Sequence, residues 1–156
     1  RHRGRGTPAP DATRFVKLVD ANVLLYAVNS DADHHERSRR WLDASLSGED
    51  TVAFAWIALL AFVRLATREG LFPHPLSMDG AMDRVDSWLS APSAVVLEPT
   101  IEHGRVLRSL LAPLTTAGNL VNDAHLAALA VEHKCDIVSF DSDFSRFAGV
   151  RWREPE

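Results

Sequence analysis

Short apolar runs alternate along the chain with longer segments in which apolar residues recur at helical spacing. The apolar runs predict β-strands, with a further edge strand at the end of the chain; they cover residues 15–19, 51–55, 94–97, 135–140 and 150–152. Residues 21–28, ANVLLYAV, suit either a turn into a helix or a longer strand. Because strands alternate with helical segments, the pattern predicts βαβ units and a mainly parallel sheet, that is, an α/β fold.

Several segments predict helices with one apolar face. Residues 33–46 place Trp41, Leu42 and Leu46 on one face, and residues 56–69 form a buried helix that ends at Gly70. Trp56 and Trp88 are interpreted as core residues.

Three further helices have recognisable ends. Ser77 caps a helix whose apolar stripe is predicted to be Met78, Met82, Val85 and Leu89. A helix over 102–114 is ended or kinked by Pro113. The helix DAHLAALAVEH takes Asn122 as its N-cap and places Asp123 in the first turn.

Composition and charge favour a single globular domain. The chain has 156 residues, of which 46% are hydrophobic and 24% charged, so we predict one domain over residues 15–156. Residues 1–14 hold no apolar run and are interpreted as a disordered tail that derives from cloning or from upstream translation. Without the four arginines and one aspartate of the tail, 13 basic and 20 acidic residues remain, a formal charge of −7. A domain of this charge needs a local basic strip or a basic partner to bind nucleic acid.

The sequence argues against a membrane protein or a disulfide scaffold. The longest apolar run, residues 52–63, is too short to cross a bilayer, and the first fourteen residues do not resemble a secretory signal. The single cysteine, Cys135, suits a reducing cytoplasm, where we expect the protein to act.

Four aspartates stand where strands end or a helix begins: Asp20, Asp123, Asp141 and Asp143. Each has a structural interpretation as a cap or turn residue. In a parallel sheet, however, such positions gather at one edge, where ligands bind. Carboxylates without histidine or cysteine favour Mg²⁺ or Mn²⁺ over Zn²⁺, and such a site indicates hydrolysis of phosphodiesters by metal-activated water. Asn22 and Asn122 are equally well interpreted as turn or cap residues and as residues that orient the carboxylates.

Three segments carry a resemblance to a known family. LVDANVLLY, NLVNDAHLAALAVEH and IVSFDSDF resemble acidic motifs of PIN domains, most closely those of VapC-type toxins. The resemblance implies a three-layer α/β/α fold and a Mg²⁺- or Mn²⁺-dependent endoribonuclease, the toxin of a type II toxin-antitoxin system. It also implies a homodimer and a VapB-type antitoxin whose C-terminal segment enters the active site.

The resemblance also assigns residues. Asp20, Asp123, Asp141 and Asp143 match the acidic positions that bind metal, and Ser139 stands where the family often has a small hydroxyl residue. Ala61 occupies or adjoins a position where PIN domains usually carry glutamate. Glu69 lies about two turns further along, some 12 Å away, so it does not obviously substitute for that glutamate.

Arginines and apolar residues supply candidate contacts. Arg64 lies within an apolar helix and is predicted to act near the acidic site, on substrate or carboxylate, whereas we interpret Arg37, Arg39 and Arg40 as a solvated helix face. Candidates for an antitoxin groove, each of which also suits the core, are Trp41, Leu42, Leu59 and Phe62.

Two alternatives remain at this stage. The loss of glutamate at Ala61 and the acidic charge suit a catalytically weakened PIN-like module that binds RNA or protein. A phosphohydrolase of the haloacid dehalogenase type also has an aspartate after its first strand, but its DxD signature contrasts with Asp20 followed by Asn22.

Overall fold

The computed structural model describes residues 15–115 and 118–156, which contain one parallel sheet. Its strands are β1 (Val16–Val19), β2 (Thr51–Phe54), β3 (Ala94–Val96), β4 (Asp136–Val138) and β5 (Trp152–Arg153). They lie in the order β3-β2-β1-β4-β5, and each pairing is parallel. The predicted parallel sheet and its terminal edge strand are confirmed. The predicted tail, residues 1–14, lies outside the described residues.

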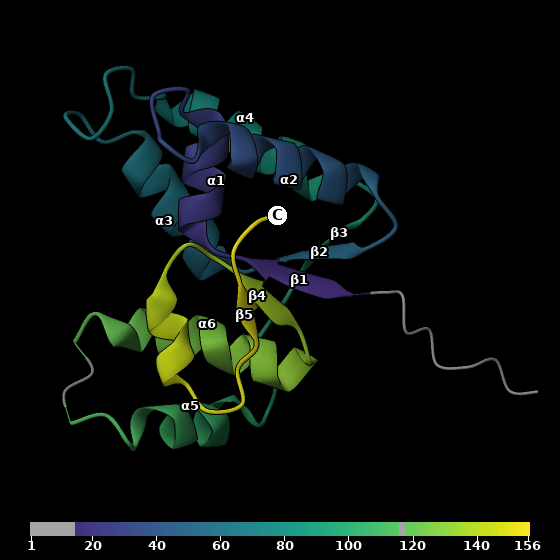
Figure 1. The fold of residues 1–156 in the computed structure, drawn as a ribbon, viewed down its shortest axis with the longest axis vertical. Helices are drawn as coiled ribbons and strands as arrows, with labels where there is room; N and C mark the ends of the chain where they lie inside the picture. The colour runs from purple at the N-terminus through teal and green to yellow at the C-terminus, as the bar shows by residue number, and fades with distance from the viewer. Residues whose placement is uncertain (1–14, 116–117) are drawn as a thin grey trace, which may run out of the picture.

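Helices cover both faces of the sheet, so the predicted three-layer α/β/α architecture is confirmed (Figure 1). One face carries α1 (Ala21–Val28), α2 (His35–Ser47), α3 (Trp56–Ala66) and α4 (Met78–Leu89). The other carries α5 (His103–Leu111), α6 (Leu120–His133) and the 3₁₀ helix η1 (Ser142–Arg146). None of these helices in the described ranges is long and apolar enough to cross a membrane.

The central strands are apolar on both sides because helices cover both sides. In β1, Leu18 faces the core beneath α5 and α6, and Val19 faces the core beneath α1 to α4; both side chains are fully buried. The same alternation in β2 sends Ala53 to one core and Phe54 to the other. This two-sided burial explains why these strands are continuous apolar runs in the sequence.

Two helix boundaries differ from those predicted. Helix α3 ends at Ala66, where the hydroxyl of Thr67 donates to the carbonyl of Val63. Helix α6 begins at Leu120 after Asn119, so the predicted N-cap role of Asn122 is wrong, although Asp123 does lie in the first turn. The helix therefore begins earlier than predicted. Its additional first turn lines the cleft described below.

The buried face of α4 also differs from the predicted stripe. The helix starts as predicted, with the hydroxyl of Ser77 accepting from the amide of Gly80 at 3.0 Å. It buries Ala81, Val85 and Trp88, however, and leaves Met78 and Met82 exposed. Trp88 packs edge-on against Phe62 with ring centroids 4.8 Å apart, and this large aromatic contact sets the rotation of the helix.

Trp56 was predicted to lie in the core, but its side chain is 41% exposed at the start of α3. The prediction of Trp88 as core is confirmed. The four candidates for an antitoxin groove are all buried in the core beneath α1 to α4, so that interpretation is wrong for Trp41, Leu42, Leu59 and Phe62.

A carboxylate joins α5 to α6. Glu132 accepts from the amide and the hydroxyl of Thr100, at 2.9 and 2.7 Å, and its other oxygen lies 2.5 Å from Nδ1 of His103. Nε2 of His103 lies 2.9 Å from Nδ1 of His125. Burial disfavours the charged carboxylate, but the hydrogen bonds from Thr100 and His103 outweigh burial and hold the pKa of Glu132 below its usual value.

We expect Glu132→Ala to lower the free energy of unfolding by about 2 kcal/mol, because it leaves the amide of Thr100 and the ring of His103 without their partner. The melting temperature should fall by about 4–8 °C at neutral pH. Since the folded-state pKa is lowered, this stabilisation is present above pH 4.5 and lost as the pH falls through the folded-state pKa. Thermal melts with the exposed Glu49→Ala as control check this; equal melting temperatures at neutral pH would contradict it.

Candidate active site

The candidate site lies where the central strands β1 and β4 end, to the left of the sheet in Figure 1. From β1 the chain leads through α1 to β2 on one side, while β4 lies on the other side, so the connections diverge at this point. Such a switch point opens a crevice at the carboxyl edge of a parallel sheet. The amide of Asp20 continues the ladder by donating to the carbonyl of Val138 at 3.0 Å, which fixes Asp20 at this edge.

One buried hydroxyl organises the residues after both strands. Oγ of Ser139 donates to Oδ2 of Asp20 at 2.7 Å and accepts from the side-chain amide of Asn22 and the backbone amide of Asp141, at 3.1 and 2.9 Å. Ser139 is fully buried. Oδ1 of Asn22 accepts from the amide of Phe140 at 3.2 Å. The loop after β4 is therefore tied to the start of α1 by a network in which each partner has a defined position.

Three carboxylates converge beside this network. Oxygen atoms of Asp123, Asp141 and Asp143 all lie within 4.8 Å of one another. Asp141 caps η1 by accepting from the amide of Asp143 at 2.9 Å, and Asp123 comes from the first turn of α6. Asp20 lies beside this group and is not one of the three converging carboxylates. One of its oxygens accepts from the amide of Ala21 and the other from the hydroxyl of Ser139.

The electrostatics of the group favour a bound cation. Burial, followed by the negative charges of Asp20, Asp141 and Asp143, raises the pKa of Asp123 to about 6. Burial also raises the pKa of Asp20, with a smaller contribution from Asp141, against the hydrogen bonds from Ser139 and Ala21. Oxygen ligands of Mg²⁺ lie about 2.1 Å from the ion and hence up to about 4.2 Å apart. Small side-chain rotations therefore suffice to gather the three carboxylates around one ion, and this donor set fits a hard divalent cation.

A cleft of about 380 Å³ leads to these carboxylates. Asp20 and Asp123 form part of its wall, with Asn119 and Asn122 at the start of α6. Helix α3 forms the opposite wall with residues spaced three and four apart along one face: Ile57, Leu60, Ala61 and Arg64. Ile57, Leu60 and Asn119 were not predicted to lie in the site. The spacing of Ile57, Leu60 and Arg64 was the available signal, but a uniformly apolar helix conceals which of its faces is open.

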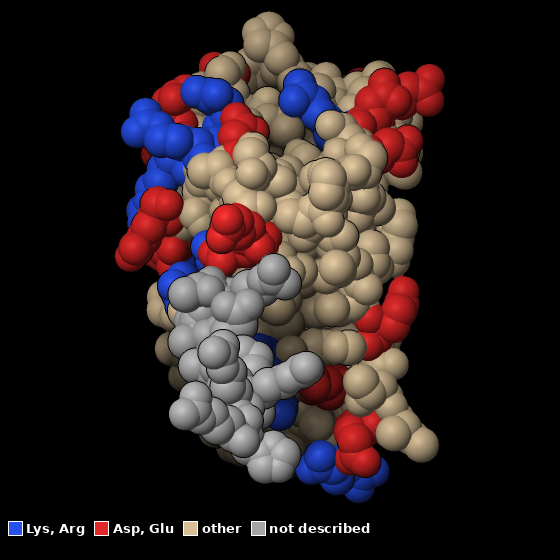
Figure 2. Space-filling view, turned by 90° about the vertical axis from the view of Figure 1, so that its right-hand side faces the viewer, with Lys and Arg blue, Asp and Glu red and all other residues tan. Residues whose placement is uncertain are grey.

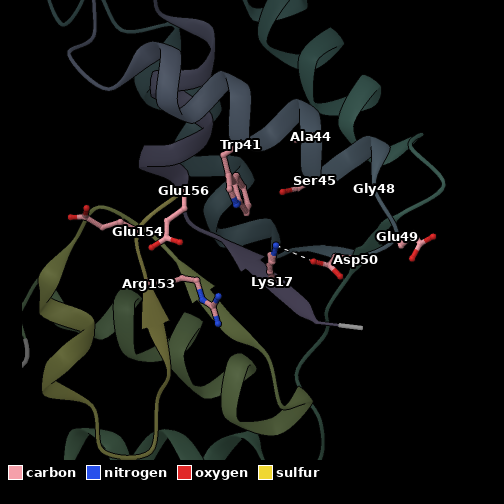
Figure 3. Close-up of a pocket in the computed structure, with 10 residues that line it drawn as sticks. All are labelled: Lys17, Trp41, Ala44, Ser45, Gly48, Glu49, Asp50, Arg153, Glu154 and Glu156. Atoms are coloured by element: carbon pink, nitrogen blue, oxygen red, sulfur yellow. Dashed lines mark ion pairs between the residues drawn. The ribbon is translucent and has the colours of Figure 1, made fainter. Parts of the chain in front are cut away.

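Another cavity, of about 560 Å³, lies away from the carboxylates, between β1, α2 and the end of the chain (Figure 3). Both of its basic side chains are paired: Lys17 lies 3.0 Å from Asp50, and Arg153 pairs with Asp136. Figure 3 shows Lys17 directed toward Asp50 beneath Trp41. Paired charges of this kind form no convergent cluster, so the cleft at the carboxyl edge is the better candidate.

The family profile described as PIN domain matches residues 17–150. The chain belongs to the PIN domain family. The predicted resemblance is thereby confirmed over nearly the whole described chain.

Curated relatives within this family are VapC ribonucleases. The chain is 61% identical over 140 residues to ribonuclease VapC37 of Mycobacterium tuberculosis, which covers 90% of this chain and 97% of the relative. It is 38% identical over 138 residues to ribonuclease VapC31 of the same organism, with 88% and 97% covered. The chain is therefore a VapC-type member of the PIN domains.

Solved structures of low sequence identity share the fold. VapBC2 from Rickettsia felis matches with a TM-score of 0.66 and 16% identity, covering 91% of this chain and 100% of that one. Mycobacterium tuberculosis VapC20, a Sarcin-Ricin loop cleaving toxin, matches with a TM-score of 0.64 and 19% identity, with 86% and 98% covered.

Ala61, predicted to occupy or adjoin the position where PIN domains usually carry glutamate, lines the cleft. Ala61 lies in the wall beside Asp20 and Asp123, and Arg64 lies one turn further along the same wall. Because Ala61 has no carboxylate, the converging carboxylates among the described residues are those of Asp123, Asp141 and Asp143. Glu69 lies beyond the end of α3, where its backbone pairs with Phe72.

Proposed function

We propose that this PIN domain protein is the toxin of a type II toxin-antitoxin system and cleaves RNA endonucleolytically with a divalent cation, Mg²⁺ or Mn²⁺. The observation that carries the proposal is the convergence of Asp123, Asp141 and Asp143 at the switch point of the sheet, beside Asp20. The identity of 61% to a VapC ribonuclease over most of both chains supports it. We assign the activity to a single PIN-like domain, residues 15–156.

We assign metal binding to the four aspartates. Asp123, Asp141 and Asp143 would hold the ion directly, and the nearby Asp20 would complete its surroundings. A bound divalent cation supplies Lewis-acid chemistry, in which a water is activated and charge on the phosphate is neutralised. Burial, followed by the charges of the neighbouring carboxylates, raises the pKa of Asp123, and a cation bound here would offset both effects.

The polar residues around the carboxylates have distinct roles in the proposal. Ser139 and Asn22 hold the carboxylate of Asp20 and the loop that bears Asp141. Asn122, exposed in the first turn of α6, faces the cleft and is assigned to substrate or to the solvent around the ion. Arg64 lies in the wall of the same cleft, and its guanidinium forms no ion pair with the described residues, so we assign it to a phosphate of the RNA.

We propose that the partner is a VapB-type antitoxin, because the fold matches solved VapBC structures. The cleft offers apolar side chains of α3, Ile57 and Leu60, beside the carboxylates, which suits a segment that carries both apolar and basic residues. We also propose a homodimer, and activity in the cytoplasm, where the RNA and the antitoxin would meet it.

The function is tested by incubating the purified, antitoxin-free protein with a pool of tRNA and ribosomal RNA fragments. We expect cleavage with Mg²⁺ or Mn²⁺, none with EDTA, and none with Asp20→Asn, because the cation has to be held at the carboxylates. Addition of Mg²⁺ should also raise the melting temperature of the wild-type protein, since a ligand that binds the folded state stabilises it.

A second function, a weakened module that binds RNA without cleavage, is favoured by one observation, the alanine at position 61 in the cleft wall. Stabilisation by Mg²⁺ together with RNA binding and no cleavage would support it. Absence of both cleavage and stabilisation would contradict the proposed metal site.

A further inference from the structure

Three aromatic rings form a cluster next to the candidate active site. The imidazole of His34 stacks on the ring of Phe140, with centroids 4.3 Å apart and planes inclined by 11°. Tyr26 is tilted against both rings, at 6.0 Å from His34 and 5.5 Å from Phe140. The guanidinium of Arg37 lies 5.5 Å from the centre of the Phe140 ring. We call Tyr26, His34 and Phe140 the aromatic platform.

The outer ring of the platform is accessible. His34 is exposed, whereas Tyr26 and Phe140 are half-buried, so His34 is the ring of the platform that solvent reaches most, although Phe140 covers one face of its imidazole. His34 stands at the N-cap position of α2, but its side chain makes no capping hydrogen bond. Capping of α2 therefore does not explain why an aromatic side chain occupies this position.

The aromatic platform and the carboxylate group share one loop of the chain, the loop that follows β4. Phe140 lies between Ser139, which binds Asp20, and Asp141, and its amide donates to Asn22 at 3.2 Å. The Cα atoms of Phe140 and Asp141 are about 3.8 Å apart. Phe140 and Asp141 are therefore direct neighbours in the loop that follows β4. A strand of RNA that crosses this loop meets the aromatic platform next to the carboxylate of Asp141.

Charge alone does not explain how this domain holds RNA. Residues 15–156 are formally acidic, with 13 basic and 20 acidic residues. Figure 2 views the side where β1 begins, away from the carboxylate edge; the basic side chains that gather at its upper left have acidic ones beside them. Stacking of unpaired bases on aromatic rings supplies affinity that does not depend on net charge.

We propose that His34, supported by Phe140, stacks on an unpaired base of the RNA substrate next to the carboxylates and so adds to the affinity for RNA. The inference rests on the proposed ribonuclease function and adds a base-binding subsite to it. Tyr26 and Phe140 hold the imidazole in place, and His34 makes the contact with the base.

The test compares His34→Ala with His34→Phe, which keeps an aromatic ring, and with the exposed His74→Ala as control. All three are placed in an Asp123→Asn background, so that the RNA is bound and not cleaved. The probes are a short fluorescein-labelled single-stranded RNA of mixed sequence and the same RNA with abasic riboses, followed by fluorescence anisotropy. We expect His34→Ala to weaken binding of the base-bearing RNA about 5- to 10-fold and His34→Phe to restore it. The abasic RNA should bind all variants equally weakly.

The proposal is overturned if His34→Ala binds the base-bearing RNA as tightly as its parent, or if His34→Phe is as weak as His34→Ala. It is also overturned if His34→Ala weakens both RNAs by the same factor, since the contact would then not be to a base. In the cleaving protein, His34→Ala should raise KM and leave kcat within about 2-fold, as expected for loss of binding that is uniform in ground and transition states. Failure of wild-type cleavage would count against the ribonuclease proposal alone, because the binding assay does not depend on cleavage.

Discussion

Asp123→Asn is expected to reduce Mg²⁺-dependent RNA cleavage by at least about 100-fold, because the electrostatic stabilisation supplied at a metal site amounts to several kcal/mol. Asp123 lies within 4.8 Å of the carboxylates of Asp141 and Asp143, and an amide nitrogen in its place offers the ion no charge. Initial rates of cleavage of a defined RNA, measured at saturating Mg²⁺, check the prediction. The exposed Asp83→Asn on α4 is the matched control and should retain the wild-type rate.

The same substitution should stabilise the metal-free protein at neutral pH. The pKa of Asp123 is raised from 3.8 to about 6 in the folded state, so stability falls as the pH rises from about 4 to about 6, where the unfolded chain has already lost the proton. Asparagine removes this cost, which we put at about 1 kcal/mol after allowance for solvent screening of a half-buried group.

Thermal melts in EDTA at pH 7.5 and below pH 4 measure this effect. The melting temperature of Asp123→Asn should exceed that of the wild type at pH 7.5, and the difference should vanish below pH 4, where both side chains are neutral. A variant that is inactive and also less stable at pH 7.5 would indicate disrupted folding and would contradict the assignment of Asp123 to the metal.

Ser139→Ala is expected to lower cleavage about 10- to 100-fold although Ser139 itself does not bind the ion. Its hydroxyl makes three short hydrogen bonds, to Asp20, Asn22 and the amide of Asp141. Removal of the hydroxyl leaves a partly buried carboxylate oxygen and a partly buried amide without this partner, at a cost of about 1–3 kcal/mol in the free energy of unfolding.

The apparent affinity for Mg²⁺ distinguishes this positioning role from a general loss of stability. If Ser139 orients Asp20 and the loop of Asp141, the concentration of Mg²⁺ at half-maximal cleavage should rise in Ser139→Ala. The exposed Ser87→Ala on α4 should change neither value. A variant with reduced stability but an unchanged Mg²⁺ requirement would show that the network supports only the fold.

The strands and their edge were predictable because their signal is local. Burial on both faces demands apolar runs such as 51–55 and 135–140, and a parallel sheet brings the ends of such runs to one edge. Asp20, Ser139 and Asp141 therefore lie at this edge on sequence grounds alone. The 3₁₀ helix after β4 agrees with the interpretation of Asp141 as a cap residue, since its carboxylate accepts from the amide of Asp143.

Which face of a helix is buried was less predictable from the sequence, because a helix such as α3 carries apolar residues on every side. The sequence of α3 does not separate Phe62, which is fully buried, from Leu60, which is 61% exposed in the cleft wall. In α4 the regular spacing of Met78 and Met82 predicted the wrong face, since packing of Trp88 against Phe62 decides the rotation. Such choices depend on residues distant in the chain.

The sequence by itself determined the parallel α/β fold, the membership of the PIN domains and the four aspartates at one edge, because strand periodicity and the order of the acidic motifs are written along the chain. Only the tertiary structure decided that Asp123, Asp141 and Asp143 converge while Asp20 is bound by Ser139, and that His34 stacks on Phe140. The contacts of Asp20 with Ser139 and of His34 with Phe140 join residues more than a hundred positions apart, and Asp123 and Asp141, 18 positions apart, lie in different elements, so local sequence carries no signal for any of these contacts.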